Sequence, residues 1–161
     1  SNFDLGKLTG NNLFQKINGT VEVNGKGLET NTINTAVKAS LQSMEWNGYT
    51  YSNINAEGTI ANKLFNGKAS VNDPNVGLNF EGIIDYSKEE LFFDFKATLK
   101  DANLYALHLD SSQSLLNAGV TMEFKGTGIS DLQGGATVPY ITLVRKNKSY
   151  EFTFLIWIVS P

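Results

Sequence analysis

The stretch LFFDFKATLK at residues 91–100 decides the fold class of this chain. Leu91, Phe93, Phe95, Ala97 and Leu99 share one side of a period of two, and Asp94, Lys96, Thr98 and Lys100 share the other. Such an alternation is typical of a β-strand with one apolar and one polar face. The stretch therefore predicts a strand that presents its apolar side chains to a single face of a sheet.

The same period of two recurs on both sides of this stretch. It is found in residues 33–41, 54–60, 76–80, 120–124 and 150–154. Threonine and the aromatic residues, which suit pleated strands, are frequent throughout. Most of the chain is therefore expected to be β-strand.

Turn residues separate these runs. Asn47-Gly48 between Trp46 and Tyr49 predicts a tight hairpin, because both residues accept a positive φ. Further turns are predicted at residues 24–25, 66–67, 73–75, 87–90 and 147–148. Short connections join antiparallel neighbours, so we expect roughly eight to eleven mostly antiparallel strands.

Three stretches depart from the alternation. Residues 101–109 place Leu104 and Leu107 three apart, which predicts a short helical turn capped by Asp101 or Asn103. Residues 111–118 predict a loop or a second short helix, and residues 126–134 a tight connector with one turn capped by Ser130. The expected fold is a mainly β, antiparallel, curved sheet or groove with one or two short helical linkers. A closed β-sandwich is the alternative, because periodicity does not distinguish an open face from a sealed core.

Composition excludes several classes of function. The chain has 161 residues, is 41% hydrophobic and 18% charged, and has a net charge of −3. This balance fits a folded chain and does not favour nucleic acid or an anionic membrane as a partner. The chain contains no cysteine and a single histidine, so thiolate and multi-histidine metal sites are excluded. We expect no metal and no cofactor.

No catalytic constellation stands out. His108 is the only imidazole, and a triad with Ser111 and Asp110 is possible only on paper, since near neighbours in sequence rarely adopt triad geometry. Glu89 and Glu90 belong to a turn and are expected to be solvated. The sequence therefore predicts a protein that is not an enzyme.

Three aromatic residues near the first hairpin allow two interpretations. Trp46, Tyr49 and Tyr51 are suitable for stacking on a sugar, and they are equally suitable for packing across the strands of the hairpin. The second interpretation is the simpler one.

Five stretches together carry a resemblance to a known family. They are residues 19–27, 47–60, 67–82, 93–109 and 128–134. The first four contain strands with a glycine turn or a short linker, and the fifth is a connector. Their order resembles the TamB family (domain of unknown function 490) of the AsmA-like superfamily, in its Bacteroidetes-like form. The resemblance covers most of the chain, whereas residues 155–161, apolar on both sides of the period, do not fit it.

The resemblance implies a long curved β-sheet with a hydrophobic lumen in the periplasm, anchored in the inner membrane by parts of the full-length protein outside this sequence. The family supports outer-membrane biogenesis, by phospholipid transfer between membranes and by assembly of outer-membrane proteins with a partner barrel. It has no catalytic residues. Residues 1–161 are accordingly expected to be one β-rich segment of a longer protein.

A groove of this kind holds acyl chains by burying CH₂ groups, each contributing about 0.8 kcal/mol. The residues expected to line it are Ile33, Val37, Leu41, Ile54, Ile60, Val76, Leu78, Phe80, Leu91, Phe93, Phe95, Leu99, Met122, Phe124, Phe152 and Phe154. Two further hypotheses remain open. One is a closed sandwich at the bacterial surface that binds glycans or proteins through Trp46, Tyr49 and Tyr51, and the other is a hydrolase centred on His108.

Overall fold

A computed structural model describes residues 3–4, 14–26, 34–61, 63–127, 131 and 133–158. These residues form ten strands: β1 (Phe3–Asp4), β2 (Phe14–Lys26), β3 (Asn34–Trp46), β4 (Tyr49–Ala61), β5 (Leu64–Asp73), β6 (Val76–Asp85), β7 (Leu91–Asn103), β8 (Ser114–Gly126), β9 (Gln133–Arg145) and β10 (Lys148–Ile158).

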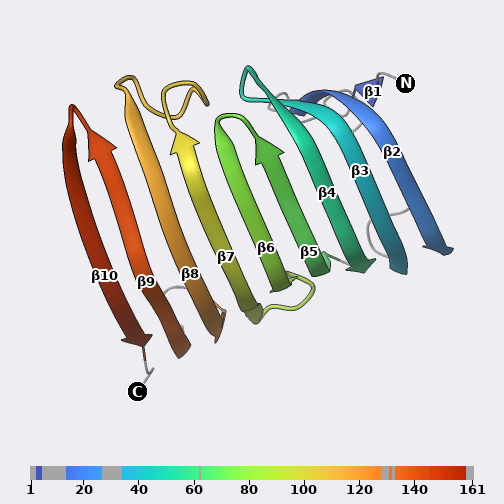
Figure 1. The fold of residues 1–161 in the computed structure, drawn as a ribbon. Helices are drawn as coiled ribbons and strands as arrows, with labels where there is room; N and C mark the ends of the chain where they lie inside the picture. The colour runs from blue at the N-terminus through green and yellow to red at the C-terminus, as the bar shows by residue number, and fades with distance from the viewer. Residues whose placement is uncertain are drawn as a thin grey trace.

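The strands form one antiparallel sheet in which each strand pairs with its neighbours in sequence, from β1 to β10 (Figure 1). The predicted mainly β, antiparallel class is confirmed. The described residues form no second sheet, so they do not make the closed sandwich that was the alternative. They also form no helix, and hence none that is long and apolar enough to cross a bilayer.

Several predicted turns are confirmed and two are wrong. Turns or bends occur at residues 47–48, 74–75, 87–90 and 146–147. Asn24-Gly25, by contrast, lies inside β2, opposite Ala36 and Thr35. Asn66-Gly67 lies inside β5, where Gly67 pairs with glycines on both neighbouring strands.

The predicted helical linkers are wrong. β7 continues to Asn103, because its end pairs with Leu115 and Leu116 of β8, and β8 already begins at Ser114, which pairs with Arg145 of β9. Between them, one tight turn follows β7, and the Asn103 side chain accepts a hydrogen bond from the Ala106 amide at 3.1 Å, so one of the two predicted caps is confirmed. Ser130 lies outside the described residues.

Cross-strand register aligns the side chains in rows. One row runs Leu41, Ile54, Val71, Leu78, Leu99, Ala118, Ile141 and Phe152 from β3 to β10. Where a strand carries an extra residue, the register shifts and the apolar side chains stay on the same side; Leu99 and Ala102 in β7 flank such a shift. The sheet consequently has one apolar face and one polar face.

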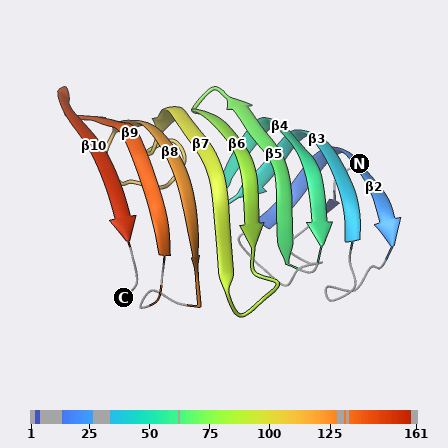
Figure 2. The same cartoon turned by 90° about the horizontal axis from the view of Figure 1, so that it is seen from below.

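The sheet is strongly bent. In Figure 2, strands β2, β3 and β4 rise, arch over and descend again. A Cβ atom added to Gly67 would lie 2.6 Å from the Cα of Gly58, and one added to Gly82 would lie 2.6 Å from the Cβ of Phe95. On the polar face, a Cβ at Gly77 would make ordinary contacts with Lys100, at 3.4 Å from its Cβ and 3.6 Å from its carbonyl oxygen. Gly67 and Gly82 therefore allow a close approach of neighbouring strands that a larger residue would prevent, and glycines of this kind introduce curvature into a sheet.

Candidate functional site: the apolar face

The apolar face brings together the side chains that the sequence predicted for a groove. Register and alternation place on it Val37, Leu41, Ile54, Ile60, Val76, Leu78, Phe80, Leu91, Phe93, Phe95, Leu99, Met122, Phe124, Phe152 and Phe154. Ile33 lies outside the described residues. The face therefore extends from β3 to β10.

Sequence reasoning missed several members of this face. Phe65 and Val71 of β5 escaped because Asn66-Gly67 was interpreted as a turn. Phe65 completes an aromatic run across three strands, with ring centroids 6.0 Å from Phe80, which in turn lies 5.3 Å from Phe95. Ile84, Ile141 and Leu143 are further members that were missed. Alternation around Gly67 was the signal that could have identified β5.

The face is covered only in part. Ile54, Val76 and Phe124 are buried, and most of the other members are half-buried by their neighbours in the same sheet. On β10, the stacked rings of Phe152 and Phe154 are each 46% exposed. Among the described residues, no second layer of strands or helices packs over this face. The described residues thus leave most of the face without a covering layer.

The opposite face is polar and carries charges of alternating sign. Lys38, Glu57, Lys68, Glu81 and Lys96 face one another in register across β3 to β7. Lys68 Nζ lies 3.0 Å from Glu81 Oε1, with side chains 71% and 66% exposed. Exposed pairs of this kind contribute about 0–1 kcal/mol each, so the row favours solubility and register more than stability.

A depression of about 760 Å³ on the described surface does not coincide with the predicted groove. Its lining is mostly polar-face residues: Lys38, Ser40, Asn55, Glu57, Lys68, Ser70, Asn79, Glu81, Lys96 and Thr98. Phe80 is the one predicted groove residue in contact with it. The depression therefore lies on the opposite side of the sheet from the predicted groove.

One loop covers part of the apolar face. Leu107, in the connection between β7 and β8, is only 2% exposed and packs against Val76 and Ala102. Partly buried apolar side chains surround this cluster: Tyr49, Tyr51, Val71, Leu99, Leu104 and Leu116. The loop therefore seals the face near the strand ends of β4 to β8.

A carboxylate holds the neighbouring hairpins together. Asp73 accepts hydrogen bonds from the Tyr49 hydroxyl at 2.6 Å, the Asn75 amide at 2.8 Å, and the amide and hydroxyl of Ser52 at 2.9 and 2.8 Å. Burial alone would raise the pKa of Asp73, but these hydrogen bonds outweigh it and hold the pKa below its usual value. Burial, together with the hydrogen bond to Asp73, raises the pKa of Tyr49.

The aromatic residues of the first hairpin take part in this packing. The ring centroids of Tyr49 and Tyr51 are 4.8 Å apart, and those of Trp46 and Tyr51 are 6.1 Å apart. Tyr49 and Tyr51 also pack against the Leu107 cluster. The geometry thus favours cross-strand packing over a free sugar-stacking platform.

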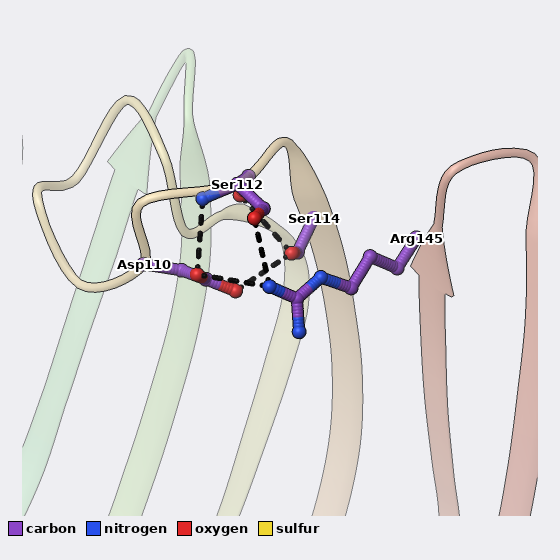
Figure 3. Close-up of polar contacts among 4 residues, drawn as sticks. All are labelled: Asp110, Ser112, Ser114 and Arg145. Atoms are coloured by element: carbon purple, nitrogen blue, oxygen red, sulfur yellow. Dashed lines mark hydrogen bonds and ion pairs between the residues drawn. The ribbon is translucent and has the colours of Figure 1, made fainter.

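A second polar network anchors the other side of the loop (Figure 3). Asp110 accepts hydrogen bonds from the Ser112 amide at 3.0 Å and the Ser114 hydroxyl at 2.9 Å, which hold the pKa of Asp110 below its usual value. Arg145 of β9 donates to the Ser112 hydroxyl at 2.8 Å and lies 3.5 Å from Asp110 Oδ1. This network ties the loop to β9.

The geometry assembles no triad at His108. Its Nδ1 lies 3.4 Å from the carbonyl oxygen of Asn47, whereas Asp110 faces Ser112, Ser114 and Arg145. Within the described ranges, no three histidine, aspartate or glutamate side chains are close enough together to hold a metal ion.

Comparisons of the chain with protein-family models, with curated proteins and with solved structures gave no match.

Proposed function

We propose that this chain is a non-enzymatic segment of a periplasmic bridge of the TamB/AsmA-like kind, and that its apolar face carries the acyl chains of phospholipids during outer-membrane biogenesis. In the full-length protein, such a segment would be held by an inner-membrane anchor and would work with an outer-membrane barrel, in lipid transfer, in assembly of outer-membrane proteins, or in both. The observation that carries the proposal is the continuous apolar face from β3 to β10, over most of which the described residues place no second layer.

The dimensions of the face suit acyl chains. Strands lie about 4.8 Å apart, so β3 to β10 span about 34 Å. One leaflet of a bilayer's hydrocarbon core is about 15 Å thick, which approximates the length of one acyl chain. A chain lying across the strands would therefore contact about four of them.

The chemistry of the face also suits acyl chains. Its rows consist of aliphatic and aromatic side chains such as Leu78, Phe80 and Phe95, which give burial without directional hydrogen bonds. Each CH₂ group removed from water contributes about 0.8 kcal/mol, so partial cover of many groups is sufficient for binding. The charged polar face keeps the outer side of the sheet in water.

Photo-crosslinking tests the proposal. A phospholipid with a diazirine in its acyl chain is expected to label the wild-type chain, and Phe93→Asp is expected to abolish labelling because it places a charge in the apolar face. The matched control is Thr98→Asp, which introduces the same charge in the same strand on the polar face, opposite the uncharged Asn79 and Gly119.

Thr98→Asp should retain wild-type labelling. Equal labelling of wild type and of a Phe93→Asp variant with an unchanged circular dichroism spectrum would remove Phe93 from the binding surface. No labelling of the wild type would refute the proposed function.

A further inference from the structure

The loop between β7 and β8, residues 104–113, leaves the sheet as one tight turn that directs Leu107 back onto it. The Leu107 amide donates to the Asn103 carbonyl at 3.0 Å, and the Leu109 and Asp110 amides both donate to the Leu104 carbonyl, at 2.8 and 3.1 Å. The turn thus has a defined geometry of its own, and Leu107 is its inward-facing side chain.

We infer that the Leu107 side chain occupies part of the apolar face and thereby determines which part of it a lipid reaches. Leu107 fills the space over Val76, Ala102 and Leu99, where it is the largest fully buried side chain among the described residues. An acyl chain cannot occupy this space while the loop is in place. Guest molecules are confined to the remaining face, which includes Phe93 and Phe95. This inference rests on the proposed function.

The loop is held on both sides of Leu107. Toward β4, the side-chain amide of Asn47 donates to the His108 carbonyl at 3.4 Å, and the His108 ring lies edge-on to Tyr49 at 6.4 Å. Toward β9, Arg145 contacts Asp110 and Ser112 as described above. These two sets of contacts hold the loop in place across the strand ends that lie between them. The loop therefore covers this part of the apolar face in the folded protein.

Side chains of the same loop that face outward supply a control. Leu109 follows Leu107 by two residues and is 52% exposed. A change there alters the loop's composition without opening the apolar face. Tyr51 packs against the cluster that Leu107 forms with Val76 and Ala102, whereas Phe93 lies on the apolar face outside this cluster. These two positions therefore report on the region beside the loop and on the rest of the face.

Site-specific crosslinking tests the inference. Tyr51 or Phe93 is replaced by p-benzoylphenylalanine, which keeps the aromatic ring of both residues and adds a photoreactive benzoyl group at the para position, and the chain is irradiated with phosphatidylethanolamine vesicles. A lipid adduct is expected from position 93 and none from position 51. Leu107→Ala should produce an adduct at position 51, and Leu109→Ala should leave the pattern unchanged.

The comparison of positions 51 and 93 with the wild-type loop tests the inference even if Leu107→Ala does not fold. Adducts of equal yield at positions 51 and 93 would overturn the role of Leu107 and leave the proposed function standing. An adduct at neither position would overturn both.

Discussion

Truncation of Leu107 is expected to destabilise the sheet far more than truncation of its near neighbour Leu109. Leu107 is 2% exposed and Leu109 is 52% exposed, although both belong to one loop. Leu107→Ala removes three buried carbon atoms, which at about 0.8 kcal/mol each amounts to about 2.4 kcal/mol. This value lies at the low end of about 2–5 kcal/mol for buried leucines, as expected where one side of the cluster can relax into an open face.

Urea unfolding followed by tryptophan fluorescence measures the difference. With a slope of about 1–3 kcal/mol per molar urea, Leu107→Ala should lower the midpoint by about 1–2 M. Leu109→Ala should change the free energy of unfolding by no more than about 0.5 kcal/mol. Equal midpoints for the two variants would refute the packing of the loop on the apolar face.

Three more predictions follow from the same structure. Gly67→Ala should destabilise the sheet by about 1–3 kcal/mol in urea, because the new Cβ meets the backbone of β4, whereas Gly77→Ala should be near neutral; similar losses for both would contradict the bend. The folded-state pKa of Asp73 is lowered, so its stabilisation is present above about pH 4 and is lost as the pH falls through the folded value; Asp73→Asn should flatten the acid side of the melting-temperature profile, and an unchanged profile would contradict its role. His108→Ala should leave lipid labelling intact, and loss of labelling in a folded variant would point to chemistry at the imidazole.

Alternation predicted most of the apolar face from sequence alone. Leu91 to Leu99 showed the pattern without interruption, and the cross-strand register carried it to β3 and to β10. Periodicity works here because successive side chains of every strand lie on opposite faces of the sheet, one apolar and one polar, so side-chain polarity follows the period of two.

The same reasoning did not predict strand β5, in which a glycine lies inside the strand instead of in a turn. Asn66-Gly67 has the composition of a hairpin, yet Gly67 is needed inside β5 because it packs against Gly58 at the bend. Ser114 belonged to a polar stretch predicted as a loop or a short helix, but its hydroxyl donates to Asp110 while its backbone pairs with β9. Both errors concern tertiary contacts between strands, which local composition does not encode.

Native mass spectrometry of the purified chain incubated with phosphatidylethanolamine tests the central claim most directly. The account predicts discrete adducts at the mass of the intact lipid on the wild-type chain, and their loss when Phe93 is replaced by aspartate. A folded wild-type chain that carries no lipid adduct under these conditions would contradict it.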